Sequence, residues 1–503
     1  MAASSASAAG TAAPREFPEL LGHPAPLWML FMTEFWERFS FYGMRWALTL
    51  YIVAQFYGGS GTGEAPANRI YGAYLALVYA SGLLGGYAAD RLIGYQRSIL
   101  LGAAIMGSGL FVMMIPSMYV FEIGLALVIV GNGLFKPNIS TMVGQLYTQS
   151  DPRRDAGFTI FYMGINAGSF ISPLLTGWLA SIITDTPLQQ NYKIVFASAG
   201  LGMVLCFLWF WFGRRQLQGI GRPPAEMSAP RNIGIVLIGS AVLVPIVYVL
   251  LAKLGADVLA WVLGVLFVGL AVMLLIEGVR EGAVARDKVV AMLIIFVFNI
   301  MFWMFYEQAG SSFNFLAEKI VNRVFGGWEF PVAWFQSVNP IGIIVLAPAF
   351  AAIWVWMGRR NIEPSIPRKF GLGLIGNGFA FLLLMFALTQ LVDAQNKIPF
   401  WTLFMVYIIQ AMGELCLSPI GLSMVTKLAP ARLVGFAMGG WFLSIATGNN
   451  LAGIFASEVS GETGMTTASA LSGYTFGWWA LAIPGALLFL IAPLINKLMH
   501  GVK

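Results

Sequence analysis

The sequence predicts an all-α membrane protein, because it is too apolar for a chain that folds in water. Of its 503 residues, 58% are hydrophobic and only 10% are charged, and the mean hydropathy is +0.77. A soluble domain usually carries about 25% charged residues. The charged residues lie between apolar runs of about 20 residues, the length that crosses the hydrocarbon core of a bilayer. These runs recur along the whole chain, which predicts a bundle of membrane-spanning helices.

The apolar runs predict about 14 spanning helices, because each is long enough to cross a bilayer. Several exceed that length, so tilted or protruding helices are expected. An even number also places both ends of the chain on the same side of the membrane. The expected spans are residues 27–56, 70–92, 98–116, 120–147, 156–183, 194–212, 233–251, 258–276, 289–317, 332–357, 370–391, 400–428, 435–457 and 474–495.

The distribution of basic residues indicates on which side of the membrane the two ends of the chain lie. Most Lys and Arg fall in the connections on one side, for example Arg91, Arg154 and Arg359, whereas the opposite connections carry few. Because cytoplasmic loops are enriched in Lys and Arg, both termini are expected in the cytoplasm. The formal net charge of +6 then reflects orientation, and a nucleic-acid partner is not indicated.

A stretch rich in arginine and proline, residues 214–231, divides the chain into parts. The first residues, up to about Glu19, are Ala/Ser-rich without an apolar core, so we expect residues 1–26 to be a cytoplasmic tail and not a cleaved signal peptide. Residues 27–213 are expected to form one six-helix bundle and residues 288–503 a second. Residues 214–287 are expected to hold the linker and a very apolar helical hairpin at the periphery.

The cysteines and histidines give no sign of a metal or cofactor. Cys206 and Cys416 lie inside apolar runs, where they are expected to act as small core residues. His23 and His500 lie outside the expected spans, so a proton relay within the membrane would have to use carboxylates.

Charged side chains inside the expected spans are the main functional signal. Each costs about 2.5–3.5 kcal/mol at mid-bilayer on insertion scales, so unpaired charges rarely persist without use. On a helical wheel at about 100° per residue, Glu34, Arg38 and Arg45 of the first helix form one polar stripe, with Tyr42 on its flank. Such a stripe is expected to line an aqueous cavity. The seven residues are Glu34, Arg38, Arg45, Glu37, Lys136, Glu307 and Glu414.

Three cations and four carboxylates leave one negative charge in excess. Burial makes that excess costly, so one carboxylate is expected to take up a proton and act as a coupling site. Two alternatives remain open at this point. The charges could form an ion-pair network that only holds the helices together, and Lys136 could extend to the membrane surface.

Several motifs along the chain resemble one family. Residues Glu34 to Gly43, EFWERFSFYG, resemble the first-helix ExxERFxYYG motif of the proton-coupled oligopeptide transporters of the major facilitator superfamily. Phe41 replaces the first tyrosine of that motif. The further matches are GGYAADR at residues 85–91, GLFKPN at 133–138, FYMGINAGS at 161–169, FW at 302–303 with EQ at 307–308, QSVNP at 336–340, GELCLSP at 413–419 and WF at 441–442.

The resemblance implies two six-helix bundles that rock about a midplane site, with an extra hairpin between them as in bacterial members. It implies a symporter that imports di- and tripeptides with protons through a bacterial inner membrane. The lipid bilayer, peptide and protons are then the expected partners of a monomer without cofactor or metal.

The resemblance also implies roles for particular residues. Glu307 is expected to carry the coupling proton and to alternate as the partner of Arg45. Glu34, Glu37 and Arg38 are also expected to take part in proton coupling, by tuning Lys136 and by carrying a proton themselves. Asp90 and Arg91 are expected to form a gate or loop lock. The expected peptide-binding residues are Arg45 and Lys136 for the carboxylate, Glu414 and Asn339 for the ammonium, and Tyr42, Tyr79, Tyr162, Asn166, Trp303, Ser418, Trp441 and Phe442 for the rest of the peptide.

Other classes of function fit the sequence less well. A channel would show short pore loops or a selectivity ring, and a membrane enzyme would show a nucleophile–base pair, a metal cluster or a phosphate loop. A receptor on the same fold remains open. So does proton-coupled uptake of another zwitterion or of an anion such as nitrate, although the first-helix charges favour peptide.

Overall fold

The computed structural model describes residues 17–148, 151–183, 190–223 and 230–502, except for the side chains of Ser418, Pro419 and Ala431. Within this part of the chain, fourteen helices have 18 or more residues, which confirms the predicted number. They are α1 (Ala25–Phe56), α2 (Glu64–Ala88), α3 (Tyr95–Val112), α4 (Met118–Gln145), α5 (Arg154–Ile182), α6 (Tyr192–Gly213), α7 (Pro230–Tyr248), α8 (Gly255–Glu281), α9 (Ala283–Tyr306), α11 (Val338–Arg359), α12 (Ile366–Gln390), α13 (Phe400–Leu428), α14 (Val434–Ser460) and α15 (Thr467–Leu498).

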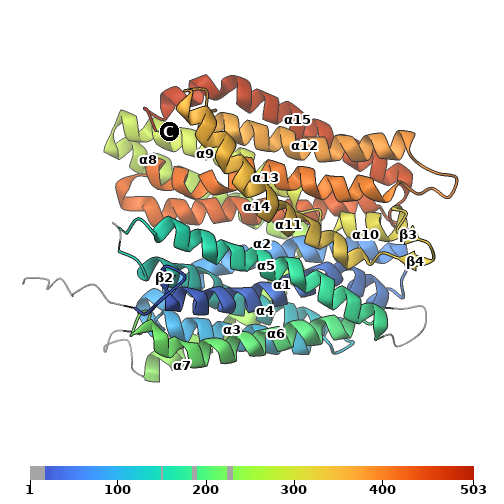
Figure 1. Ribbon diagram of the computed structural model, residues 1–503, viewed down its shortest axis with the longest axis horizontal. Coiled ribbons are helices and arrows are strands. Elements are labelled where there is room, and N and C mark those ends of the chain that lie inside the picture. The colour runs from blue at the N-terminus through green and yellow to red at the C-terminus, as the bar shows by residue number, and fades with distance from the viewer. Residues whose placement is uncertain (1–16, 149–150, 184–189, 224–229, 503) are drawn as a thin grey trace, which may run out of the picture.

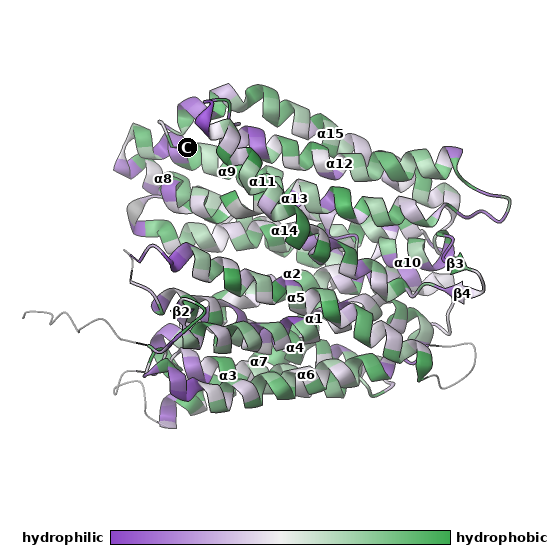
Figure 2. Ribbon diagram, viewed as in Figure 1, coloured by the Kyte–Doolittle hydropathy of each residue, from purple (hydrophilic) through white to green (hydrophobic). Residues whose placement is uncertain are grey.

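Ten segments are both long and apolar enough to cross a membrane. The hairpin α7–α8 counts as one of them, because a short π-helix at Val249–Leu254 joins its two helices without a break. The more polar helices α1, α3 and α14 are not among the ten, although they lie in the same bundle. In Figure 2 the hydrophilic residues gather at the two ends of the molecule, and the hydrophobic ones cover its middle.

The predicted span 289–317 is wrong in one respect, because it is not one helix. Helix α9 ends at Tyr306, and a short helix, α10 (Ser312–Lys319), follows after a turn. Broken helices persist in membranes where side chains satisfy the freed backbone groups. Here Thr49 and Asn314 donate to the carbonyl of Gly310 at 3.1 and 3.2 Å, and Ser311 donates to that of Glu307 at 3.2 Å.

The predicted span 332–357 also begins differently. Residues Val332–Ser337 form a 3-10 helix before α11 begins. Two short hairpins are also present: β1 (Glu19–Leu20) pairs with β2 (His23–Pro24), and β3 (Val324–Phe325) pairs with β4 (Trp328–Glu329).

The helices of the first half of the chain lie together, and so do those of the second half (Figure 1). Helix α1 packs along α5 and α6, and α12 lies against α13 and α15. The halves meet where α2 packs on α14 and where α5 packs on α11 and on the 3-10 helix before it, and α1 also contacts α10. In the hairpin, α7 contacts α4 while α8 contacts α9 and α14, so it spans both halves from outside. The domain boundaries at residues 26, 213 and 287 stay a prediction.

The two ends of the molecule differ in how tightly the halves meet. Strand β2 and the C-terminal residues lie at one end, here called the termini end, and α10, β3 and β4 lie at the far end (Figure 1). At the far end, Asn68 of α2 donates to the carbonyl of Ala456 in α14 at 3.1 Å. The buried carboxylate of Glu64 pairs with Lys319 and accepts from the backbone N–H of Met465 at 2.8 Å. The far end is therefore closed.

Glycines permit this closure. A Cβ on Gly453 would lie 2.5 Å from the carbonyl oxygen of Asn68 and 2.7 Å from the Cα of Gly72. Small residues let helices approach closely in membranes. We predict that Gly453→Val forces α2 and α14 apart at the far end, at a cost of about 1–3 kcal/mol. Spin labels at exposed Thr62 and Glu462 would then report longer distances.

The matched control is Gly435→Val in the same helix, since a Cβ there meets nothing within 4 Å. The control is expected to keep the distances of the unsubstituted protein. Equal distance distributions for the two variants would show that the glycine contact does not hold the far end closed.

Candidate transport site

A cavity of about 330 Å³ lies between the two halves of the chain. Helices α1, α2, α4 and α5 form one wall, and α9, α11, α13 and α14 form the other. Most of the residues predicted to bind substrate line it: Tyr42, Arg45, Tyr79, Lys136, Tyr162, Asn166, Trp303, Asn339, Glu414, Trp441 and Phe442, together with Arg38 and Glu307. The sequence-derived expectation of a charged cavity is therefore met by the geometry.

An ion pair across the cavity joins the two halves. The Arg45 guanidinium donates to the Glu307 carboxylate at 2.5 Å, and these side chains are only 9% and 7% exposed. The Nε of Arg45 also donates to the hydroxyl of Tyr71 at 2.6 Å. Because Glu307 directly follows the end of α9, the pair ties α1 to the break in this helix. The structure thus places the two predicted partners in contact.

A second group of charges lies within the first half of the chain. Arg38 donates to Glu37 at 2.5 Å and lies 3.4 Å from Glu34. Lys136 of α4 pairs with Glu34, so its side chain turns into the protein and the alternative of extension to the membrane surface is wrong. Asn132 adds a bond to Glu37 at 3.2 Å. Glu34 and Glu37 are fully buried and lie behind the cavity wall.

Glu414 differs from the other six charged residues. Its carboxylate accepts a hydrogen bond from the hydroxyl of Tyr306, which in turn accepts one from Asn339 at 2.8 Å. No ion pair in the described part of the chain involves Glu414, whereas the three cations are matched by Glu34, Glu37 and Glu307. The single excess negative charge predicted from the sequence therefore falls on Glu414 in this conformation.

The aromatic side chains surround these charges. The ring of Tyr42 lies between two guanidinium groups, 5.9 Å from that of Arg38 and 5.4 Å from that of Arg45. Trp303 packs edge-on against Tyr306, with ring centroids 5.2 Å apart. Tyr162 and Phe442 are about two-fifths exposed, so they border the open part of the cavity.

Some predicted residues lie elsewhere. Asp90 and Arg91 are exposed in a short π-helix at Ala89–Ile93, where Asp90 accepts a hydrogen bond from the hydroxyl of Tyr95 at 2.6 Å. They do not line the cavity, and their role as a gate or loop lock stays a prediction. Ser418 belongs to α13, but its side chain lies outside the described residues. Phe41 is buried under the Arg38 guanidinium, 4.8 Å from its ring centroid, and is not a lining residue.

Sequence reasoning missed several residues of the site. Tyr306 and Tyr407 line the cavity, and Gln410 lies one turn before Glu414 on α13. The spacing of Gln410 from Glu414 was a usable signal, because residues four apart share a helix face. The tyrosines carried no such signal in a chain with 38 Phe, 16 Tyr and 16 Trp.

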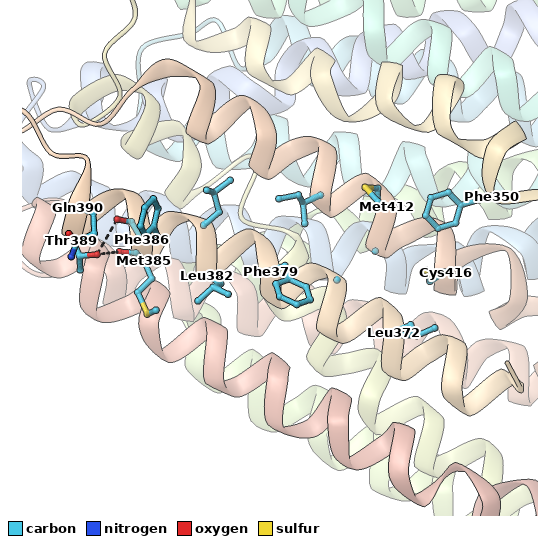
Figure 3. Close-up of a pocket in the computed structure, with 14 residues that line it drawn as sticks. Phe350, Leu372, Phe379, Leu382, Met385, Phe386, Thr389, Gln390, Met412 and Cys416 are labelled. Atoms are coloured by element: carbon cyan, nitrogen blue, oxygen red, sulfur yellow. Dashed lines mark hydrogen bonds between the residues drawn. The ribbon is translucent and has the colours of Figure 1, made fainter. Parts of the chain in front are cut away.

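A larger hollow of about 1,050 Å³ lies among α11, α12 and α13 (Figure 3). Its lining is apolar except near Thr389 and Gln390, and the labelled Phe379, Leu382 and Phe386 follow one face of α12. No charged side chain lines it. Ligand sites combine an apolar lining with a few convergent polar groups, so the charged cavity is the better candidate.

Long membrane helices around a buried, charged cavity between two halves define a membrane transporter. The sequence model of the POT family matches residues 96–470. The chain therefore belongs to the POT family, which confirms the family and the fold inferred from the motifs. This is a family of transporters, so the chain is not an enzyme.

The relatives agree with this assignment. The chain is 35% identical to the peptide transporter YePEPT of Yersinia enterocolitica, over 96% of both chains, and 32% identical to the dipeptide and tripeptide permease B of that species, over 89% of both. Among solved structures, it resembles a peptide transporter POT in complex with sulfate, with a TM-score of 0.82, 33% identity and coverage of 97% and 98%. A POT family transporter in complex with 5-aminolevulinic acid gives a TM-score of 0.80, 30% identity and coverage of 96% and 99%.

The Glu34–Lys136 pair makes a prediction about stability. Lys136→Met leaves the fully buried carboxylate of Glu34 without its ammonium partner and is expected to destabilise the fold by up to about 3–5 kcal/mol. The added substitution Glu34→Gln removes the stranded charge and is expected to restore part of the loss. Thermal unfolding in detergent measures both effects.

The matched control is Lys193→Met at the start of α6, where no ion pair is present in the described part of the chain. It is expected to change the unfolding temperature little. An equal loss in Lys193→Met, or a double variant less stable than Lys136→Met, would contradict the structural role of the pair.

Proposed function

We propose that the chain is a proton-coupled symporter that imports di- and tripeptides by alternating access. The observation that carries the proposal is the charge distribution of the cavity. Cations from α1 and α4 form one wall, and the opposite wall holds Glu414 without a cation. A zwitterionic peptide has one charge for each wall. The relatives named as peptide transporters and as a dipeptide and tripeptide permease support this substrate class.

The ammonium of the peptide is proposed to bind Glu414. That carboxylate already accepts a bond from Tyr306, and Asn339 holds the same tyrosine in place. A charged donor adds a stronger bond than a neutral one, and it balances the one unpaired charge. The carboxylate of the peptide is proposed to bind Arg45 and Lys136, with Tyr42, Tyr79, Tyr162, Asn166, Ser418, Trp303, Trp441 and Phe442 around its backbone and side chains.

The coupling proton is proposed to bind Glu307. Protonation neutralises the carboxylate, so Arg45 loses its ion pair and keeps only the bond to Tyr71. Arg45 then becomes free to bind the carboxylate of the peptide. When the proton leaves, the pair forms again and competes with the peptide for the guanidinium. Proton and peptide thereby share one residue, which links their movements.

The same proton is proposed to act on the closed far end. Four polar contacts join α1 to the broken helix in the described structure: Arg45 with Glu307, Thr49 with the carbonyl of Gly310, and Asn314 with the carbonyl of Trp46 at 2.9 Å and with the hydroxyl of Thr49 at 3.1 Å. Of these, only the first is an ion pair. Protonation therefore weakens closure at the far end and favours the conformation that opens there.

The orientation of the protein and the roles of the remaining residues complete the proposal. The termini end is proposed to face the cytoplasm of a bacterium and the far end to face the outside of its inner membrane, and the excess of basic residues in the connections on one side supports this orientation. Glu34, Glu37 and Arg38 are proposed to tune Lys136, and Asp90 and Arg91 to lock the cytoplasmic loop. The protein is proposed to act as a monomer, with the proton as coupling ion and without a cofactor or metal.

Uptake into reconstituted vesicles tests the coupling. An inward proton gradient is expected to drive accumulation of dialanine by the unsubstituted protein. Glu307→Gln is expected to abolish this accumulation and to retain exchange of dialanine across the membrane, because a neutral side chain leaves Arg45 available but carries no proton. Accumulation that is independent of the proton gradient would contradict the symport proposal. Gradient-driven accumulation by Glu307→Gln would show that another residue carries the coupling proton.

Tyr306→Phe tests the ammonium site. It removes a hydrogen bond to a charged group, worth about 1.5–3 kcal/mol, so dialanine affinity is expected to fall about tenfold or more. Equilibrium binding of dialanine measures it.

Tyr51→Phe is the control, since the Tyr51 hydroxyl of α1 is buried without a hydrogen-bond partner and lies outside the cavity. It is expected to bind dialanine as the unsubstituted protein does. Unchanged affinity in Tyr306→Phe would show that this hydroxyl does not position Glu414.

A further inference from the structure

A strongly basic hollow lies at the termini end, away from the transport cavity. It has a volume of about 490 Å³ and lies between the start of α3, the end of α6 and the segment that follows α6. Four of its seven lining residues are arginines, and none is acidic. The lining residues are Gln96, Arg97, Trp211, Arg214, Arg215, Arg222 and Pro223.

The arginines of this hollow have no acceptor within the described part of the chain. In this part of the chain no ion pair and no side-chain hydrogen bond involves any of the four, and the Nη1 of Arg97 is buried without a partner. Some basic side chains of the same fold are paired, as Arg69 is with Asp257 and Arg153 with Asp151. In the hollow, four arginines lie together without such a partner in the described part of the chain.

The walls of the hollow are fixed by other contacts. Gln96 donates its side-chain N–H to the carbonyl of Ile220 at 2.6 Å, and its backbone N–H to that of Gly221 at 3.0 Å. These bonds hold the segment after α6 against the first turn of α3. The Arg214 guanidinium lies over the ring of Trp211, 3.8 Å from its centroid. The arginines are thus gathered by the backbone and by stacking, without an anion from the described residues.

Like charges at such short range repel each other, and a bound anion removes that cost. The first turn of α3 adds the positive end of a helix dipole. Arginine binds phosphate oxygens with two parallel N–H donors, a geometry suited to this anion. The chemistry of the hollow is therefore that of a phosphate site.

The neighbouring surface indicates where the phosphate comes from. Trp211 is 43% exposed, and Leu208 and Phe212 on the same helix are also exposed. Tryptophan gathers at the boundary between lipid and water, so the hollow lies at the level of lipid headgroups. A lipid with its phosphate in the hollow would lay its acyl chains along this apolar face of α6. Basic pockets between helices bind anionic headgroups in this way.

We propose that the hollow binds the phosphate group of an anionic phospholipid from the leaflet at the termini end. The bound phosphate bridges Arg97 on α3 to Arg214 and Arg222 on the segment that leads toward α7. It thereby fastens that connection to the first half of the protein. This site is separate from the transport cavity, and its occupation does not depend on the substrate proposed above.

Native mass spectrometry of the full chain in detergent tests the site, with added dioleoyl phosphatidylglycerol or dioleoyl phosphatidylcholine as probe. The variant Arg97→Gln/Arg214→Gln/Arg222→Gln is compared with Arg280→Gln/Arg359→Gln/Lys497→Gln, which removes the same charge at the same end outside the hollow. Phosphatidylglycerol is expected to bind the first variant about tenfold more weakly or worse, and the second about as well as the unsubstituted protein.

Inorganic phosphate in a second arm distinguishes the sources. If inorganic phosphate stabilises the unsubstituted protein and phosphatidylglycerol is not preferred, the hollow binds phosphate but the lipid is not its source, and the proposal of a bound phospholipid is overturned. Equal weakening in both triple variants, or equal binding of the two lipids, would overturn the proposal. If the first variant does not fold, Arg97→Gln and Arg222→Gln alone are each expected to weaken phosphatidylglycerol binding more than Arg280→Gln does, and equality would overturn it.

Discussion

The balance of charge inside an apolar medium is the constraint on which this structure depends. An ion that leaves water for a low-dielectric interior loses several kcal/mol of solvation even after relaxation, and only a close partner offsets that loss. The chain places three cations and four carboxylates within its spans, and it packs α1, α4 and the end of α9 so that six of them meet as pairs. The seventh, Glu414, is stabilised by hydrogen bonds alone. The helix arrangement around the cavity follows from this pairing.

The break after α9 shows how the pairing shapes the backbone. Had this helix continued through residue 317, its backbone carbonyls would have been satisfied internally and its path would have been fixed. Instead the carbonyl of Gly310 accepts bonds from Thr49 of α1 and from Asn314. The break thus frees a backbone carbonyl that accepts one bond from the other half, from Thr49, and one from the short helix that follows. Glu307 lies at the start of the break, so the residue that meets Arg45 also lies where the backbone is able to change direction.

The sequence predicted the spans, the polar stripe and the family because each depends on local signals: run length, helical periodicity and short motifs. It did not predict which carboxylate meets which cation. That choice depends on the distances between α1, α4 and α9, which no single segment encodes. The break after Tyr306 was missed because a few polar residues inside a long apolar run keep the hydropathy of a span. Tyr306 itself was missed because an aromatic residue in such a run is usually a packing residue.

Glu414 and the arginines around Arg97 are two unmatched charged sites, and they differ in sign and place. Glu414 is negative and faces a cavity that closes and opens with the two halves, so its partner has to be able to arrive and leave. The arginines around Arg97 are positive and lie in a hollow fixed by the Gln96 bonds, next to the exposed face of α6. A permanent neighbour such as a lipid suits that setting. The unpaired charge thus indicates a transported ligand at Glu414 and a permanently bound ligand at the arginines around Arg97.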